Sequence, residues 1–259
     1  MKVYIQKLGT GIPFVFLHGW GFDSNIWLPI ANKLTERFSL YLVDLPGFGQ
    51  TPNMSWDNFK NSLLEQLPGE FILIGWSLGG LFATKLTIEE PKLVKRLINV
   101  TTSPRFIVDD NWAGIKQEAF ADFYDKFLLN AKIARDKFMR TQLKSIQLPK
   151  DIISIKDPTH IGLQYGLDIL INWDLRDDLE KITVPVLYIF GNLDSIVPKL
   201  TFNIMREKYP MFKYVLFKKS AHMPFLSHPD EFIELITLDF MTFSKSAQNC
   251  RLCEQSEAI

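Results

Sequence analysis

Short runs of mostly apolar residues, each bounded by polar or turn-forming residues, recur along the chain. The six clearest runs occupy residues 14–17, 40–43, 71–74, 97–100, 186–190 and 214–217. Their side chains do not alternate between apolar and polar, so we expect strands that are buried on both faces, as in a parallel sheet. Helix-length amphipathic stretches, such as residues 27–38 and 81–90, separate most of these runs. Strand and helix in alternation predict an α/β fold with a mostly parallel, doubly wound sheet.

The alternation stops between residues 104 and 173. Large apolar residues such as Phe120, Phe123 and Phe127 recur there at helical spacing, without a convincing strand. We therefore expect residues 104–173 to be a helical lid, inserted into a core made of residues 1–103 and 174–243. The apolar side chains of the lid could seal it onto the core or line a pocket, and the pattern alone does not separate these two roles.

The composition argues against several kinds of partner. The 29 basic and 29 acidic residues balance, so no overall charge favours binding to nucleic acid or to an anionic membrane. The chain lacks an apolar run of about 18 residues that could span a membrane, and its first residues lack the pattern of a secretion signal, so a cytoplasmic location is expected. Cys250 and Cys253 lie in the polar segment 244–259, which we expect to be disordered. They could be half of a metal site, but the sequence has no second such pair.

A candidate nucleophile follows the strand predicted at residues 71–74. Residues 75–79 read Gly-Trp-Ser-Leu-Gly and precede a predicted helix. A serine on a sharp turn between strand and helix is called a nucleophile elbow, and the flanking glycines let the helix approach the strand without a clash. This context favours Ser77 as the nucleophile of a hydrolase.

A serine hydroxyl is a weak nucleophile until a base, usually histidine, removes its proton. His222 follows a predicted strand across a short loop late in the chain, where the base of this arrangement is expected. His18 lies in a loop before the nucleophile, where a structural role is expected. His160 lies inside the predicted lid, and His228 lies at the start of the last predicted helix. His222 is therefore the expected general base.

The histidine needs a carboxylate that fixes its tautomer and stabilises its charged form. Asp194 comes just past the strand predicted at residues 186–190, and active sites of open α/β sheets form at such strand ends. Asp44 also follows a strand, but it precedes the serine and its setting indicates a structural turn. Asp174 has the position of a surface acid at a helix start. The chain order of serine, aspartate and histidine then favours Asp194.

Hydrolysis also needs backbone N–H groups that point at the negative oxygen of the tetrahedral intermediate. The N–H of Leu78, directly after the nucleophile at a helix N-terminus, is one candidate. The second is the N–H of Trp20, in the His-Gly-Trp-Gly loop at residues 18–21. Trp20 and Leu78 are therefore the expected oxyanion hole. The chemistry requires no metal and no cofactor.

Five segments give the chain a resemblance to the α/β-hydrolase superfamily along nearly its whole length: residues 18–21, 44–49, 75–80, 191–194 and 220–222. Within that superfamily, segments 17–21, 75–81, 102–104, 112–116 and 221–229 are similar to the BioH-type carboxylesterases. That family demethylates pimeloyl-[acyl-carrier protein] methyl ester in biotin synthesis. The resemblance therefore implies hydrolysis of this methyl ester, with the acyl-carrier protein as partner.

The resemblance also implies which residues contact the substrate. A short lid segment would line the acyl channel, and its Phe-x-x-x-Gln pattern corresponds here to Phe138, Met139, Arg140, Thr141 and Gln142. The core residues implied by the same resemblance are Trp20, Ser77, Leu78 and His222. The rest of the lid sequence and the polar segment from residue 244 depart from the family, which bears on the substrate and not on the triad.

The predicted lid holds a local excess of positive charge. Between residues 130 and 150 there are six basic residues and a single acidic one, Asp136. These side chains could be solvated helix faces. Alternatively, Arg135, Lys137 and Lys144 could dock the acidic carrier protein.

The sequence therefore predicts a serine carboxylesterase that works through an acyl-enzyme on Ser77. A broad-specificity short-chain esterase or a thioesterase is the nearest alternative, because the same triad serves any accessible acyl group. A protein that keeps the fold but only binds a ligand is a further alternative. An aspartate nucleophile is disfavoured because serine stands at the elbow.

Overall fold

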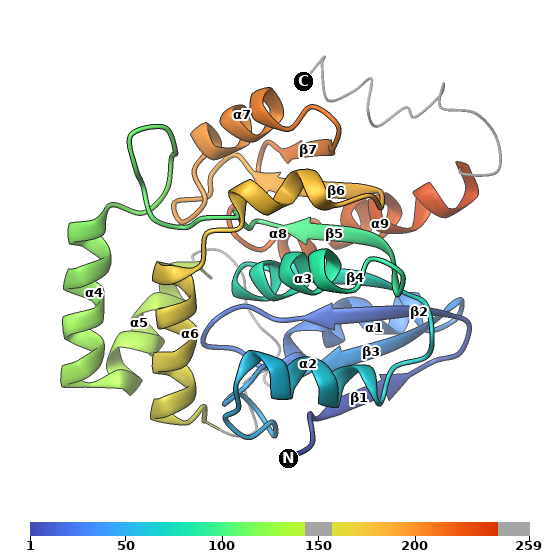
Figure 1. Ribbon diagram of the computed structural model, residues 1–259, viewed down its shortest axis with the longest axis horizontal. Coiled ribbons are helices and arrows are strands. Elements are labelled where there is room, and N and C mark those ends of the chain that lie inside the picture. The colour runs from blue at the N-terminus through green and yellow to red at the C-terminus, as the bar shows by residue number, and fades with distance from the viewer. Residues whose placement is uncertain (143–156, 243–259) are drawn as a thin grey trace.

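The computed structural model describes residues 1–142 and 157–242. Its centre is a seven-stranded sheet in the order β1-β3-β2-β4-β5-β6-β7 (Figure 1). The strands are β1 Ile5–Leu8, β2 Ile12–Leu17, β3 Phe38–Val43, β4 Phe71–Trp76, β5 Val94–Val100, β6 Val186–Gly191 and β7 Lys213–Phe217. β1 pairs antiparallel with β3, and the other neighbours pair in parallel. The predicted α/β fold with a mostly parallel sheet is confirmed.

All six predicted strands are present, and the sequence analysis missed β1. This strand has four residues, lies at the edge of the sheet and is only partly buried. A run this short gives little periodic signal. The helix predicted at residues 27–38 was too long, because a 3-10 helix η1 Ser24–Trp27 leads into α1 Leu28–Leu34, and β3 already begins at Phe38.

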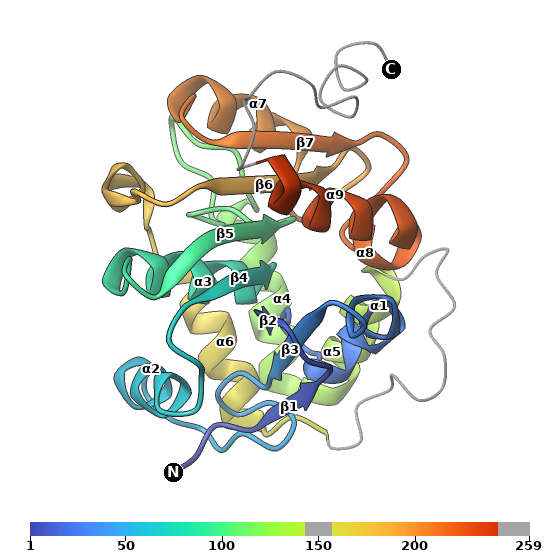
Figure 2. The same ribbon diagram turned by 90° about the vertical axis from the view of Figure 1, so that its right-hand side faces the viewer.

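Alternate residues of the strands serve two apolar cores, one on each face of the sheet. Val15 and Leu17 pack in the core that includes residues of α2 Trp56–Leu64, α3 Leu78–Glu89 and α7 Lys199–Lys208. Phe14 and Phe16 pack in the core that includes residues of α1, α8 Pro224–Ser227 and α9 Pro229–Thr242. Figure 2 shows these two groups of helices on opposite sides of the sheet. Because both faces are covered, the central strands are apolar throughout and could be recognised in the sequence.

Between β5 and β6 the chain leaves the sheet and forms α4 Gln117–Leu129, α5 Ala131–Gln142 and α6 His160–Asn172, which we call the helical insertion. These helices lie together beyond the carboxyl ends of the parallel strands (Figure 1). The chain returns to β6 through a 3-10 helix, η3 Arg176–Lys181. Residues 143–156 of the predicted lid and the tail predicted at 244–259 lie outside the described residues.

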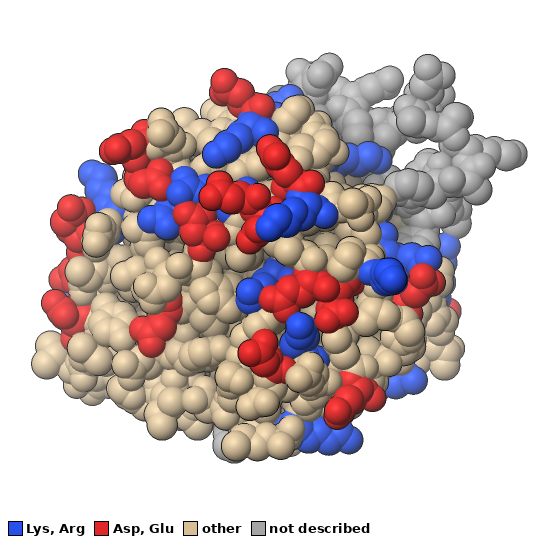
Figure 3. All heavy atoms as spheres, viewed as in Figure 1, with Lys and Arg blue, Asp and Glu red and all other residues tan. Residues whose placement is uncertain are grey.

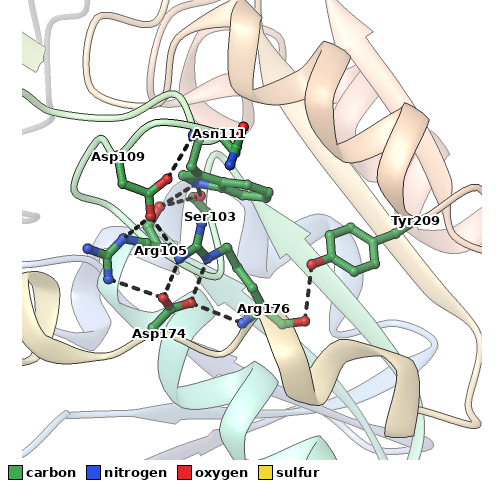
Figure 4. A network of polar contacts seen from close by, with 8 residues as sticks. Ser103, Arg105, Asp109, Asn111, Asp174, Arg176 and Tyr209 are labelled. Carbon is green, nitrogen blue, oxygen red and sulfur yellow. Dashed lines mark hydrogen bonds and ion pairs between the residues drawn. The ribbon is translucent and has the colours of Figure 1, made fainter.

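A network of ion pairs joins the two ends of the helical insertion (Figure 4). Nη1 of Arg105 lies 3.1 Å from Oδ2 of Asp174, and Nη2 of Arg176 lies 2.8 Å from Oδ2 of Asp109. Although burial opposes the shift, hydrogen bonds from Arg176 hold the pKa of Asp174 below its ordinary value. Asp174 is exposed, as the sequence suggested, and it also ties the two ends of the helical insertion together through its ion pairs.

The surface carries no dominant charge on the face drawn in Figure 3, where basic and acidic side chains are interspersed. Among residues 1–142 and 157–242, none of the helices is long and apolar enough to cross a membrane. The cytoplasmic location stays a prediction.

Candidate active site

Ser77 stands at the sharp turn between β4 and α3. Its backbone has φ +55° and ψ −119°, a conformation that costs a residue with a side chain roughly 1–3 kcal/mol. The surroundings hold it there: the Ser77 N–H donates to the carbonyl O of Val100 at 3.0 Å, and the Thr102 hydroxyl donates to the carbonyl O of Ser77 at 2.7 Å. A Cβ on Gly79 would lie 2.4 Å from the carbonyl O of Leu17, so only glycine fits between α3 and β2. The turn therefore has the geometry that the motif predicted.

His222 and Asp194 form a buried pair in the loops after β7 and β6. Nδ1 of His222 lies 2.7 Å from Oδ2 of Asp194, and because an ionised carboxylate only accepts, Nδ1 carries the proton. The other oxygen of Asp194 accepts the N–H groups of Ile196 and Val197 at 2.8 and 3.1 Å. Both carboxylate oxygens are thus engaged, and they hold the imidazole with Nε2 pointing away from Asp194.

Hydrogen bonds tie the backbone of His222 to the elbow. Its carbonyl O accepts the Trp76 indole N–H and the Thr101 hydroxyl, each at 2.8 Å. Nε2 of His222 is buried and has no hydrogen-bond partner within the described part of the chain. In a neutral ring protonated at Nδ1 this nitrogen is an acceptor. The structure thus brings Ser77, His222 and Asp194 to one edge of the sheet, without the serine–histidine hydrogen bond that such sites often complete only with substrate bound.

His18 has the structural role that the sequence analysis expected. Its Nε2 accepts the Leu45 N–H at 3.0 Å, so the ring joins the loop after β2 to the loop after β3. Burial lowers the pKa of His18, although the nearby charge of Asp44 opposes the shift. Asp44 accepts the N–H groups of Ser24 and Gln50, each at 2.8 Å, in the same loops. Both side chains therefore accept hydrogen bonds from backbone N–H groups, which is a structural role.

The expected oxyanion donors lie on α3 and on the loop after β2. Leu78 is the first residue of α3, so its N–H has no partner within the helix. The Trp20 indole donates to the carbonyl O of Leu163 in α6 at 2.8 Å. Its ring meets Phe138 of α5 edge-on, with centroids 5.2 Å apart. The helical insertion therefore holds the loop that carries the Trp20 N–H.

An apolar cavity of about 210 Å³ opens beside Ser77 and Trp20. Large side chains from the loop after β5 and from the helical insertion form most of its wall: Phe106, Ile115, Phe120, Phe123, Phe138, Leu167 and Leu170. Ser195 and Ile196, directly after Asp194, complete it. The insertion therefore lines a pocket in addition to sealing the core, so both roles considered for its apolar residues occur.

A second cavity, of about 400 Å³, shares Phe123, Phe138 and Ile196 with the first. Its other lining residues belong to α4 and α5 and include Lys126 and Lys137. Because the two cavities share part of their walls, they adjoin. The first lies beside Ser77, and the second lies on the α4–α5 side of the helical insertion.

The five residues predicted to line the acyl channel have different positions on α5. Phe138 lies between the two cavities, and Thr141 and Gln142 line the second one. Arg140 is exposed and lines an open hollow outside α5. Met139 lines neither cavity and packs toward Gly21 and the core on the other face of the sheet. Successive helical positions point about 100° apart, so one continuous segment cannot line one channel with all its side chains.

Other residues near the site differ from expectation. Leu78 and His222 line neither cavity with their side chains. Ser195 lines the first one, and the sequence analysis missed it although it directly follows Asp194. The anchoring roles of Trp76 and Thr101 toward His222 were also missed, since they join parts of the chain more than 100 residues apart.

The predicted docking residues separate into three cases. Lys137 is exposed on α5. Arg135 is only 8% exposed, and its guanidinium pairs with Asp136 and Asp157 at 3.0 and 2.9 Å, so the prediction that it docks a partner was wrong. Asp157 lies outside residues 130–150, for which the charges were counted, and only folding brings it close to Arg135. Lys144 lies outside the described residues.

A serine on a strained turn, a histidine with a free acceptor nitrogen and a carboxylate that fixes its tautomer can transfer an acyl group to water. Within residues 1–142 and 157–242, His, Cys, Asp and Glu side chains form no cluster of three that could hold a metal ion. Cys250 and Cys253 lie outside that part of the chain.

Comparison with known proteins places similar sequences along most of the chain. A family model described as "Alpha/beta hydrolase family" matches residues 14–235. The chain is 49% identical over 236 residues to the "Pimeloyl-[acyl-carrier protein] methyl ester esterase" of Legionella pneumophila (strain Corby), with 91% of this chain and 98% of that protein covered. It is 35% identical over 251 residues to the protein of the same name from Aeromonas hydrophila subsp. hydrophila, with the same shares covered.

Solved structures resemble the fold. An esterase from Exiguobacterium antarcticum superposes with a TM-score of 0.83 at 24% identity, covering 93% of this chain and 96% of that one. E-2-(acetamidomethylene)succinate hydrolase gives a TM-score of 0.74 at 20% identity, covering 91% and 94%. At these identities the likeness concerns the fold alone.

Proposed function

The chain belongs to the alpha/beta hydrolase family, and we propose that it hydrolyses the methyl ester of pimeloyl-[acyl-carrier protein] through an acyl-enzyme on Ser77. The observation that carries the proposal is the meeting of Ser77, the buried His222–Asp194 pair and an apolar cavity at one edge of the sheet. The relative with 49% identity, named for this activity, supports the choice of substrate.

In the first half of the reaction, Oγ of Ser77 attacks the ester carbonyl while Nε2 of His222 takes its proton. The negative oxygen of the tetrahedral intermediate rests against the N–H groups of Leu78 and Trp20. Asp194 accepts the hydrogen bond from Nδ1 and stabilises the imidazolium. The C–O bond to the methoxy group breaks, His222 returns the proton to that oxygen, and methanol leaves.

In the second half, water attacks the acyl-enzyme carbonyl while Nε2 of His222 takes a proton from it. The bond to Oγ of Ser77 then breaks, and the proton returns to that oxygen. The products are the pimeloyl carrier with a free carboxylate and the regenerated enzyme. The chemistry needs no cofactor.

The cavities suit an acyl chain that carries a methyl ester at one end and the carrier protein at the other. An alkyl chain is apolar and fits the walls of the cavity at Ser77, which are formed largely by Phe, Leu and Ile side chains. The second cavity continues toward α4 and α5, so the carrier protein would remain outside while the methyl ester reaches Ser77. The path through Phe138 would set which acyl chains fit.

The carrier protein would dock on the outer side of α5. Lys137 and Arg140 are exposed there and line the same open hollow, and basic side chains on an interface rim speed the encounter with an acidic partner. Lys144, predicted to take part, lies outside the described residues. Arg135 takes no part because it is buried and paired. By family resemblance the reaction would serve biotin synthesis in the cytoplasm.

The test compares three substrates: the carrier-bound methyl ester, a short aryl ester and a short acyl thioester. We expect kcat/KM to be highest for the carrier-bound ester. Higher values for the aryl ester or the thioester would instead indicate the broad esterase or thioesterase considered from the sequence. Native protein that a fluorophosphonate does not label at Ser77, and that turns over none of the three, would indicate a binding protein.

A further inference from the structure

Arg135 is a buried charge on a helix whose other basic side chains are exposed or partly exposed. Its guanidinium donates to Asp136 at 3.0 Å and to Asp157, just before α6, at 2.9 Å. The hydrogen bond and charge of Arg135 hold the pKa of Asp157 below its ordinary value. Burial of a charged group is costly unless it is paired. The two carboxylates therefore hold the Arg135 guanidinium between α5 and the segment that precedes α6.

The apolar stem of the same side chain lies against Gly21. A Cβ on Gly21 would lie 3.3 Å from Cγ of Arg135 and 3.8 Å from Cγ of Met139. Arg135 and Met139 are four positions apart and so share a face of α5. Gly21 has φ +85°, which a residue with a side chain would adopt only with strain. This face of α5 therefore covers the Trp20–Gly21 turn in the loop after β2.

The turn carries the expected oxyanion donor. Trp20, directly before Gly21, is fixed by its indole bond to Leu163. Behind the loop, a Cβ on Gly19 would lie 2.9 Å from the ring of Trp76, so the loop cannot retreat on that side. The loop is thus held between Trp76 on the core side and Arg135 on the insertion side.

We propose that Arg135 is a positioning residue: its stem, fixed by Asp136 and Asp157, presses the Trp20–Gly21 turn into the place where the Trp20 N–H meets the oxyanion. The inference rests on the proposed serine-esterase function, although not on the identity of the substrate. The N–H acts on the transition state more than on the bound ester. Loss of the stem should therefore lower kcat and leave KM nearly unchanged.

The experiment measures kcat per active site, titrated with a fluorophosphonate, in Arg135→Ala, Arg135→Lys and Asp157→Asn. Lys208→Ala, an exposed basic position on α7 that lines neither cavity, is the control. Removal of one oxyanion donor costs about 10²–10³ in kcat, so its displacement in Arg135→Ala should cost about 10-fold, equally for the aryl ester and the carrier-bound ester. Arg135→Lys keeps the stem and the charge and should restore most of the rate. Lys208→Ala should leave the turnover of both esters unaffected.

The affinity for a trifluoromethyl ketone, which forms a tetrahedral adduct with serine, should not change if Arg135 has only a structural role. If Arg135 positions the oxyanion donor, this affinity should fall in Arg135→Ala by the same factor as kcat/KM, while the affinity of the product carboxylate stays constant. If Arg135→Ala does not fold, the proposal is tested with Arg135→Lys and Asp157→Asn. We expect small losses in kcat in these two variants, with parallel losses in affinity for the ketone.

Two results would overturn the proposal: an unchanged kcat per titrated site in the Arg135 and Asp157 variants, or a loss confined to the carrier-bound ester. Wild-type protein that turns over the aryl ester but not the carrier-bound ester would contradict the proposed substrate and leave the Arg135 test intact. Wild-type protein that turns over no ester would contradict both.

Discussion

The edge of the sheet formed by the carboxyl ends of its parallel strands, where the proposed catalytic residues lie, and the helical insertion are held by different kinds of contact. At the edge, backbone atoms of Ser77 and His222 take part in hydrogen bonds that fix the residues in space. In the insertion, side chains make the decisive contacts, such as the ion pair of Arg135 with Asp157. The insertion also leaves Leu129 86% exposed and Ile133 65% exposed.

This difference separates the residues proposed to carry the reaction from those proposed to select the substrate. Residues at the edge are set by short local motifs, so a change there should abolish turnover of every substrate. Residues of the insertion that line the cavities, or the surface around them, should instead set which substrate is turned over, whereas Arg135 of the insertion should affect the rate with every ester.

The largest effect is expected at His222. Without the imidazole no group removes the proton of Ser77, so His222→Ala should lower kcat by about 10⁶-fold. Unfolding by urea, followed by circular dichroism, should show that the variant remains folded. Substantial turnover in a folded variant would show that another base acts.

Asp194→Asn should come next. The amide favours the wrong tautomer of His222, and the expected loss in kcat is about 10⁴-fold, for aryl and carrier-bound esters alike. The measurement is steady-state turnover of both esters. A loss restricted to one ester would contradict the expectation that a change at the carboxyl ends of the strands affects every substrate.

Phe138 lies between the two cavities, so its removal should change substrate choice. Because a missing apolar contact of this size is worth about 10–200-fold in discrimination, Phe138→Ala should raise KM for long acyl esters by about 10-fold and affect an acetate ester much less. Phe138→Leu is the matched control that keeps an apolar wall. Equal losses for long and short esters would place Phe138 with the edge residues.

The exposed basic residues of α5 should matter only for the carrier. Reversal of Lys137 and Arg140 to Glu should lower kcat/KM for the carrier-bound ester by about 10-fold at low salt, and less at physiological salt where the Debye length is about 8 Å. Lys208→Glu, an exposed change on α7, is the control. An equal loss for a neutral aryl ester would count against a docking role.

The smallest effect concerns stability and His18. Because burial lowers the pKa of this histidine in the folded state, the unfolded chain binds its proton more readily. Its contribution to the free energy of unfolding is therefore complete at neutral pH and declines as the pH falls below about 6.5, by at most about 1.4 kcal/mol per pH unit. His18→Asn should lose this part of the pH dependence. Urea unfolding of both proteins at pH 7 and pH 5 measures this pH dependence. An equal change in the free energy of unfolding between the two pH values in both proteins would contradict the prediction.

The sequence predicted much more of the edge than of the insertion, for a physical reason. The central strands were recognisable because they are buried on both faces, and Ser77, Asp194 and His222 stood out as candidates because each follows a strand in a local motif. Arg135 was misassigned because its partner Asp157 reaches it only through the fold. The contacts of Trp20 with α5 and α6 could not be predicted for the same reason, because they join residues that are far apart in the sequence.

The proposed mechanism and substrate are tested together by measuring the release of methanol and free acid from pimeloyl-[acyl-carrier protein] methyl ester, with wild-type protein and with Ser77→Ala. We expect rapid release by the wild type and, because the nucleophile is absent, a rate lower by about 10⁶-fold in the variant, with the same folded stability. Release at the wild-type rate by Ser77→Ala would contradict the mechanism. A wild type that leaves this ester intact would contradict the substrate.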